Sequence, residues 1–330
     1  MAAAPAIAPR AAAMNGPVAR WLPDGRRLHL NHGPIDLIVE AFGDDGERRL
    51  AYRQAAGRFQ TVLGELVAEL PALRRPVGQE RQVFASGTAR RMERAVCPHF
   101  PAFVTPLAAV AGSVADEVLA AMVEGRDLER AYVNNGGDIA FHLSPGARMA
   151  AAIAGTGHGL SDRIEIASEH PVRGLATSGW RGRSHSLGIA DAVTVLARNA
   201  AMADAAATLI ANAVDLPGHP AIVREPANSI DPDSDLGARM VTQGVGALTT
   251  QEIDEALASG LAVAEDMRSR GLITAAALFL CGAHRLYEAF PGQLLCAPRR
   301  ERDCDQGANT AITERLGSRA GSSERNREHA

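Results

Sequence analysis

The sequence of 330 residues contains no lysine, so that all 34 basic side chains are arginine. A Schiff-base enzyme needs a lysine amine, and a phosphate-binding loop of the Gly-Lys-Ser/Thr type needs a lysine at its end. Both classes are therefore excluded. Aromatic residues are also scarce, at 4% of the chain, so small aliphatic side chains must fill the core of a protein that is 46% hydrophobic.

Excess positive charge and patterned cysteines are missing as well. The formal net charge is -4, which argues against a protein that holds nucleic acid by bulk charge. The 4 cysteines, Cys97, Cys281, Cys296 and Cys304, show neither the spacing of a zinc site nor that of a disulfide framework. We expect reduced thiols without a special role.

Long apolar runs and targeting signals are not apparent either. The chain has no stretch of about 18 consecutive apolar residues, so no membrane span is expected. Residues 1–16 are rich in Ala and Pro and lack the basic and long apolar segments of a signal peptide. We therefore expect a cytoplasmic protein with a disordered extension (1–20), one folded domain (21–297) and a disordered polar tail (298–330).

Hydrophobic patterning predicts strand pairs that alternate with single long helices. Residues 26–52 are typical of a small β-meander, with Asp44-Asp45-Gly46 as one of its turns. A helix should run over 54–70 and stop at Pro71, and another should start at Thr105, a good N-cap. Further helices are expected over 198–214 and over 250–270, where Thr250 is the cap, and strands over 132–133, 139–143, 163–167, 172–176, 192–197 and 273–281. This order favours a mixed α/β (α+β) fold over a doubly wound parallel sheet.

One candidate site lies on the predicted helix 198–214. Asp204 and Thr208 are four residues apart, so their oxygens face the same way, and Asn212 extends the row. A carboxylate and a hydroxyl are suitable ligands for Mg²⁺, which completes its shell with waters and substrate phosphates. The alternative is a solvated polar stripe on an alanine-rich helix.

A second candidate site follows the predicted strand 172–176. Thr177, Ser178 and Gly179 are small residues that let a ligand approach the backbone, and Arg181 and Arg183 come directly after them. Hydroxyls, backbone amides and arginines suit a diphosphate. An ordinary polar turn is the alternative. We expect strands 172–176 and 192–197 to share one sheet with helix 198–214 packed on it, which would bring this segment near Asp204.

A third candidate site is the predicted hairpin at residues 134–138. Its Asn-Gly sequence first of all indicates a tight turn. Asp138, directly after the turn, has the chemistry either to bind a ligand hydroxyl or to cap the turn. His185 follows the arginine-rich segment, although an isolated histidine is more often structural than catalytic.

Together these motifs resemble the landmarks of the ApbE family of flavin transferases. Asn-Asn-Gly-Gly-Asp-Ile at 134–139, Ala-Thr-Ser-Gly at 176–179, Val-Thr-Val at 193–195 and Ala-Asp-Ala…Thr at 203–208 occur in the family's order and approximate spacing. The similarity covers roughly residues 26 to 290 and is greatest to an uncharacterised cytoplasmic branch.

The resemblance implies an ApbE-like fold of mixed or antiparallel sheets flanked by helices, related to the T-fold. It also implies FAD and Mg²⁺ as cofactors and transfer of FMN to a hydroxyl of an acceptor protein. By the same resemblance, residues 135–138 and 177–179 line the flavin pocket, and Asp204, Thr208 and the carbonyl of Val110 hold the metal. The flavin-pocket residues are Asn135, Gly136, Gly137, Asp138, Thr177, Ser178 and Gly179.

The chain departs from the family pattern at the residues expected to do chemistry. The family's Ala-Lys-Gly-Tyr-x-x-Asp segment corresponds to residues 110–116, where Asp116 remains and the lysine is missing. The family's His-x-Ile-Asp-Pro segment is reduced to residues 185–188. His185, Asp116 and Asp191 are the candidate general bases. FMN transfer or a related diphosphate cleavage, a flavin- or nucleotide-binding module without catalysis, and an interaction protein that kept only the fold all remain open.

Overall fold

The computed structural model describes residues 16–152, 163–287 and 295–296. The predicted tail 298–330 and residues 1–15 of the predicted extension lie outside the described residues. The strands are β1 (Val18–Trp21), β2 (Leu28–His32), β3 (Ile35–Gly43), β4 (Leu128–Asn135), β5 (Asp138–Leu143), β6 (Arg148–Ala152), β7 (Arg163–Ala167), β8 (Gly174–Ser178), β9 (Ala192–Ala197), β10 (Ile222–Pro226), β11 (Met240–Val245), β12 (Ala275–Leu280), β13 (Ala283–Tyr287) and β14 (Leu295–Cys296). The helices are α1 (Asp45–Leu73), α2 (Gly87–Val96), α3 (Val110–Val123), α4 (Ala200–Ala213), α5 (Ala227–Ile230) and α6 (Thr250–Ser269), with short 3₁₀ turns at Cys97–His99 and Pro106–Ala109.

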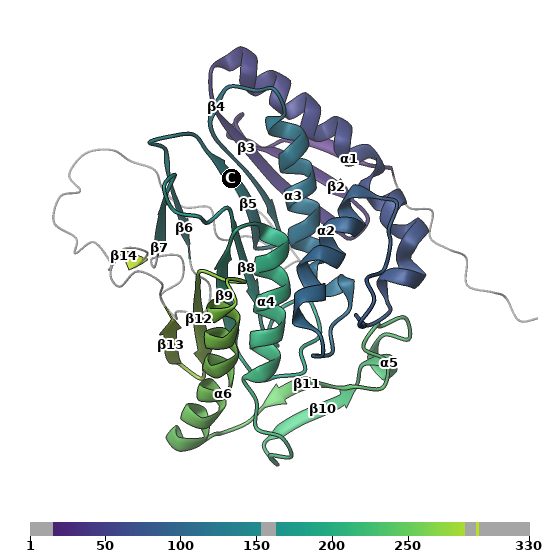
Figure 1. Ribbon diagram of the computed structural model, residues 1–330, viewed down its shortest axis with the longest axis vertical. Coiled ribbons are helices and arrows are strands. Elements are labelled where there is room, and N and C mark those ends of the chain that lie inside the picture. Colours follow the sequence, from purple (N-terminus) through teal and green to yellow (C-terminus); the bar gives the residue numbers. More distant parts are fainter. Residues whose placement is uncertain (1–15, 153–162, 288–294, 297–330) are drawn as a thin grey trace, which may run out of the picture. The chain divides into compact units, whose positions relative to one another are not determined.

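The main sheet has nine strands in the order β1-β2-β3-β4-β5-β8-β9-β12-β13 (Figure 1). Every neighbouring pair in it is antiparallel. A three-stranded sheet, β14-β7-β6, and the two-stranded sheet β10-β11 complete the strands. The predicted fold class, α+β with mixed or antiparallel sheets flanked by helices, is confirmed, and all strand pairs among the described residues are antiparallel.

Different layers cover the two faces of the main sheet. Figure 1 shows α1, α3, α4 and α6 along one face. On strand β9, which is buried along its whole length, Val193 and Val195 belong to the core shared with α4 and α6, whereas Leu196 packs with Ile164 of β7 on the other face. This alternation explains why 192–197 is apolar at every position: a strand covered on both faces has no solvent side. The predicted central strand is confirmed.

Helix α1 begins earlier and ends later than predicted. The segment Asp44-Asp45-Gly46 is not a turn between strands, because the Asp44 carboxylate accepts hydrogen bonds from Gly46 N and Glu47 N and so caps the helix. Acidic residues in the first turn also suit the helix dipole. Pro71 does not stop the helix, which continues to Leu73, since a proline so close to the end removes few hydrogen bonds.

Two other predicted caps are wrong in detail. Helix α6 is capped by Thr249 rather than Thr250, in a capping box with Glu252. Thr105 makes no capping hydrogen bond; its hydroxyl donates to Asp235 instead, and a 3₁₀ turn precedes α3.

Several short elements were not predicted. Helix α2 and strands β6, β10, β11 and β13 have patterns too brief or too exposed to stand out. Strand β1 begins at Val18, inside the segment predicted as the extension 1–20, and it pairs with β2. By contrast, β7 and β9 have the predicted bounds, and β8 and β9 are neighbours with α4 packed on both, as expected.

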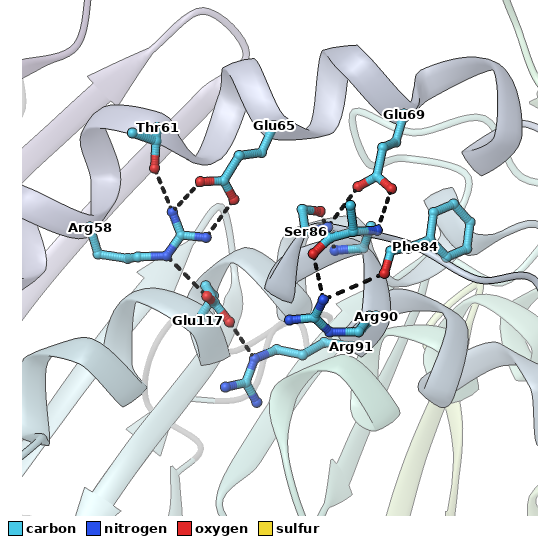
Figure 2. A network of polar contacts seen from close by, with 11 residues as sticks. Arg58, Thr61, Glu65, Glu69, Phe84, Ser86, Arg90, Arg91 and Glu117 are labelled. Atoms are coloured by element: carbon cyan, nitrogen blue, oxygen red, sulfur yellow. Dashed lines mark hydrogen bonds and ion pairs between the residues drawn. The ribbon is translucent and has the colours of Figure 1, made fainter.

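A partly buried polar network ties the first three helices together (Figure 2). Glu117 of α3 accepts from Arg58 of α1 at 3.0 Å and from Arg91 of α2 at 2.7 Å. Arg58 also pairs with Glu65 of its own helix. These charge-assisted bonds hold α3 in place between α1 and α2, and α3 carries part of the candidate site.

By length and composition alone, the stretch Pro106–Val123 could cross a membrane, contrary to the expectation that no such stretch exists. In the structure half of it is buried inside the protein. It carries Asp116 and Glu117, both of which are engaged by neighbouring elements. This is the pattern of a core helix.

Candidate functional site

Helices α3 and α4 cap each other. The Asp116 carboxylate of α3 accepts from Ala200 N at 3.0 Å and from Ala201 N at 2.9 Å, in the first turn of α4. In return, Asp204 of α4 accepts from Gly112 N at 2.9 Å, in the first turn of α3. The unsatisfied amide groups of both helix starts thus receive a carboxylate from the partner helix. Asp116 and Asp204 therefore both have a structural role.

The two helices approach closely because Gly112 has no side chain. A Cβ atom at Gly112 would lie 2.3 Å from the carbonyl oxygen of Ala200. Real carbon atoms do not come this close to backbone oxygen, so a larger residue would force the helices apart. The small residue in the 110–116 segment is therefore needed for packing.

Asp138, the first residue of β5, lies near Asp204. Its carboxylate accepts from Thr177 N at 3.2 Å, which links the hairpin to the end of β8. Burial raises the pKa of Asp138 to about 7. Burial and then the negative charge of Asp138 raise the pKa of Asp204 well above its usual range. The two carboxylates repel each other, and a cation would relieve this repulsion.

The residues around this acidic pair are oxygen donors. Thr208 lies one turn beyond Asp204 on α4, and Val110 is the first residue of α3. Asp138, Asp204 and Thr208 are each intermediate in burial, between the core and the exposed surface. Across the described ranges, no group of three or more His, Cys, Asp or Glu side chains is arranged to hold a metal. An ion here would need ligands from hydroxyls, carbonyls, waters or a substrate.

The predicted hairpin between β4 and β5 is confirmed. Gly136 and Gly137 form its turn with φ angles of 66° and 116°, a region that favours glycine. Asn134 Oδ1 accepts from Gly137 N at 2.9 Å, and Asn135 Nδ2 donates to the carbonyl of Ala111 at 3.1 Å. The Asn135 amide therefore ties the hairpin to the first turn of α3, next to Gly112, whose N–H donates to Asp204.

A cleft of about 1040 Å³ opens on the face of the sheet opposite the helices. Its floor includes Ile139 and Leu175, and β6 contributes Met149 and Ala151 to its side. The other residues that line it are Phe42, Arg130, Tyr132, Asn134, Gly136, Gly137, Ala150, Ala152, Thr177, Ser178, Gly179, Arg181, Gly182, Asp191 and Ala192. The cleft is apolar along its floor. It is polar at the edge where β4 and β8 end and β5 begins.

The structure divides the predicted site residues between this cleft and the helix side of the sheet. Five of the predicted flavin-pocket residues line the cleft: Gly136, Gly137, Thr177, Ser178 and Gly179. The acidic pair Asp138 and Asp204 does not line the cleft; it lies behind the hairpin, where Thr177 N joins the two regions. Asn135, Thr208 and Val110 lie on the same side as the pair. The hairpin rim therefore separates five of the seven predicted flavin-pocket residues from the predicted metal residues, and the other two, Asn135 and Asp138, lie on the metal side.

The candidate general bases are placed less favourably. Asp191 lines the cleft, but its oxygens accept from Arg181 Nε and from Cys281 N, each at 2.6 Å. Asp116 is occupied by the helix α4 amides, and burial raises its pKa to about 6. His185 is half-buried and is not one of the described residues that line the cleft.

Sequence reasoning missed the residues that line the far part of the cleft. Arg130 and Tyr132 lie on β4 two residues apart, on the same face as Asn134, and Phe42 pairs with Arg130 across the sheet. Their alternation along β4 was a usable signal. It was lost because the strand was predicted to start at 132.

Comparison with known proteins gives matches of three kinds. The family model described as "AbpE bacteria" matches residues 19–286. A UPF0280 protein of Methanothrix thermoacetophila is 38% identical over 142 residues, which are 42% of this chain and 56% of that relative. A UPF0280 protein of Methanococcoides burtonii is 32% identical over 185 residues, 56% of this chain and 76% of the relative. The match spans about half the length of the first such relatives, for example 49% in Methanopyrus kandleri.

Solved structures resemble the chain more distantly. A mutant of the flavin transferase ApbE from Vibrio cholerae aligns with a TM-score of 0.41 and 13% identity, over 82% of this chain and 96% of that one. The apo flavinyl transferase ApbE of Pseudomonas stutzeri aligns with a TM-score of 0.33 and 17% identity, over 78% of this chain and 76% of that one. On the strength of the family model, which spans most of the chain, this protein belongs to the ApbE-like superfamily, in a branch of uncharacterised type.

Proposed function

We propose that this protein binds a flavin dinucleotide together with a divalent cation. The flavin arm would lie in the cleft, the diphosphate would cross the rim formed by Gly136–Gly137 and Thr177–Gly179, and the cation would sit at Asp138 and Asp204. The observation that carries the proposal is the acidic pair directly behind a glycine hairpin at the rim of a large apolar cleft.

The rim suits a diphosphate. Gly136 and Gly137 have no side chains to hinder an approaching phosphate, and Thr177 and Ser178 offer hydroxyls. The guanidinium of Arg183 lies against Gly136, where an added Cβ would be 2.2 Å from Arg183 Nη2, and Arg181 lines the cleft. Arginines and exposed amides are common ligands of phosphate oxygens. The volume of the cleft matches that of cofactor sites.

The acidic pair suits a hard cation such as Mg²⁺. Asp138, Asp204 and the Thr208 hydroxyl, with the carbonyl of Val110, would hold it, and phosphates and waters would complete the shell. The repulsion between Asp138 and Asp204 supports this assignment, because a bound cation would remove it. When bound, such an ion neutralises diphosphate charge.

Binding is better supported than transfer chemistry. The oxygens of Asp116 and Asp191 are already used by protein donors, and His185 is not among the described residues that line the cleft. FMN transfer to an acceptor hydroxyl is the second candidate function. It is favoured by Asp191, the candidate base that borders the cleft, which would take the proton once a ligand drew Arg181 away from it.

Titration of the protein with FAD tests the proposal. We expect FAD to bind in the presence of Mg²⁺ and to bind at least about tenfold more weakly in EDTA, since the cation offsets the repulsion between phosphates and carboxylates. Calorimetry or flavin fluorescence would measure both affinities, and chromatography for released AMP would detect cleavage. Absence of binding by FAD and ADP with Mg²⁺ would refute the proposal.

A further inference from the structure

The outer edge of strand β1 carries main-chain groups that none of the described residues pairs with. Strand β1 ends the nine-stranded sheet, has β2 as its neighbour, and is exposed at all four positions. Leu22 N donates to Arg27 O where the β1–β2 hairpin begins. Because hydrogen-bonded pairs alternate along an antiparallel ladder, the N–H and C=O groups of Ala19 and Trp21 point away from β2. An open edge of this kind can pair with another extended chain.

A groove of about 580 Å³, which we call the edge groove, lies between β1 and helix α1. Ala19 and Trp21 line it from the strand. Its other apolar residues are Leu28, Tyr52 and Ala56. The Trp21 ring meets the Tyr52 ring edge to face, with centroids 4.8 Å apart, yet Trp21 remains 54% exposed. Tryptophan and tyrosine are enriched at protein–protein interfaces, so this groove has the composition of a docking surface.

Arg49 and Arg53 give the edge groove a positive charge. They lie one turn apart on α1, both line the groove, and both are exposed. Neither makes a hydrogen bond or an ion pair with another described residue, so each keeps its guanidinium donors for a ligand. Two like charges at this spacing also repel each other. A carboxylate beside them would remove this repulsion.

We propose that the β1 edge binds an extended acidic segment of a partner protein, which adds a strand to the main sheet. A residue paired with Ala19 or Trp21 places its side chain on the same face of the sheet as theirs, over the edge groove. Alternate side chains of the segment therefore enter the groove. An apolar one packs against Trp21, and acidic ones pair with Arg49 and Arg53. The main chain supplies affinity and the groove supplies specificity.

A second copy of β1 does not match this edge. The antiparallel register that joins Ala19 of one copy to Trp21 of the next places the two Arg20 side chains directly opposite each other. Like charges in that position are destabilising. The sequence of β1, Val-Ala-Arg-Trp, also has no carboxylate to offer Arg49 and Arg53. Charge complementarity thus favours an acidic partner over self-association.

A fluorescent heptapeptide, Thr-Glu-Thr-Leu-Thr-Glu-Thr, tests the proposal by anisotropy with the full chain. As a strand it places both glutamates and the leucine on one face, and its sequence is the same in both directions. We expect it to bind at least about tenfold more tightly than the same peptide with lysine in place of both glutamates, because attraction to the arginines becomes repulsion.

Variants of β1 test the main-chain contact. Ala19→Pro removes an N–H that points away from β2, so it leaves the β1–β2 ladder intact, and proline is tolerated on edge strands. This variant should bind the acidic peptide about tenfold more weakly. Ala19→Ser keeps the N–H and is the matched control, with affinity expected within about twofold of the wild type.

Variants of the arginines test the charge. Arg49→Glu combined with Arg53→Glu should reverse the preference, so that the lysine peptide binds more tightly than the acidic one. Arg20→Glu is the matched control, because Arg20 alternates with Ala19 and Trp21 and so lies on the opposite face of β1. It should still prefer the acidic peptide.

Three results would overturn the proposal. They are equal binding of the two peptides by the wild type, an unchanged preference in the double arginine variant, and a dimer of the full chain in sedimentation that Ala19→Pro dissolves. The last would assign the edge to a second copy. The edge groove and the cleft share no lining residue, so FAD titration of the same variants should match the wild type. Failure of the peptide to bind would therefore leave the proposed function standing.

Discussion

Replacing Asp204 with Asn should make the metal-free protein more stable and the magnesium-bound complex less stable. Without a cation, the Asp204 charge is disfavoured by burial and by Asp138, which is why its pKa is raised. The Asn amide oxygen can still accept the hydrogen bond from Gly112 N, so α3 keeps its cap. Each kcal/mol gained would raise Tm by about 2–4 °C for a domain of this size.

With Mg²⁺ and FAD present, the wild type should instead be more stable than Asp204→Asn. A ligand at one hundred times its Kd stabilises the wild type by about 2.7 kcal/mol, and the variant should gain almost none of this.

The stability difference between the metal-free wild type and Asp204→Asn should also depend on pH, with a defined sign. A raised carboxyl pKa costs stability above that pKa, and the cost disappears as the pH falls, so the metal-free advantage of Asn should shrink in acid.

Thermal unfolding with and without Mg²⁺ and FAD measures these effects. Asp266→Asn on α6 is the matched control, since its side chain is 61% exposed and its loss should change neither condition. Equal stabilisation of wild type and Asp204→Asn by Mg²⁺ and FAD would show that Asp204 serves only as a helix cap.

Gly112→Ala should be strongly destabilising, although alanine is the better helix former. The added carbon would lie 2.3 Å from Ala200 O and 2.8 Å from Ala201 N, and these are backbone atoms that cannot move aside alone. Separating α3 from α4 would also lengthen the hydrogen bonds of Asp116 and Asp204. We expect a loss of about 3 kcal/mol in the free energy of unfolding, measured in urea, together with weaker magnesium-dependent binding.

Gly64→Ala provides the opposite control. Gly64 is an exposed residue within α1, and a Cβ there would meet nothing within 4 Å. The higher helix propensity of alanine should then determine the effect, and we expect the free energy of unfolding to rise by about 0.5–1 kcal/mol. If Gly112→Ala were also stabilising, the close contact between α3 and α4 would be absent from the protein in solution.

Local patterns in the sequence were enough to predict several parts of the fold and site. The four-residue spacing of Asp204 and Thr208 identified a helix face, and the all-apolar run of β9 identified a strand covered on both sides. The glycines of the 134–138 hairpin required a tight turn whatever surrounded them. Each of these features depends on neighbours within a few residues.

The mutual capping of α3 and α4 could not be predicted in this way. Asp116 and Ala200 are 84 residues apart, and Gly112 and Asp204 are 92 residues apart, so only tertiary packing brings them together. For the same reason the sequence did not show that the hairpin rim separates Asp204 from the cleft. The cap at Asp44 was missed for a different reason: Asp-Asp-Gly suits a turn and a helix start equally well.

Anomalous diffraction from crystals grown with Mn²⁺ and FAD tests the central claim most directly, because Mn²⁺ replaces Mg²⁺ at oxygen sites and can be located by its scattering. We predict one strong peak between the carboxylates of Asp138 and Asp204, with the diphosphate of FAD crossing the Gly136–Gly137 rim. A bound flavin whose diphosphate lies elsewhere, with no peak at the acidic pair, would contradict the account.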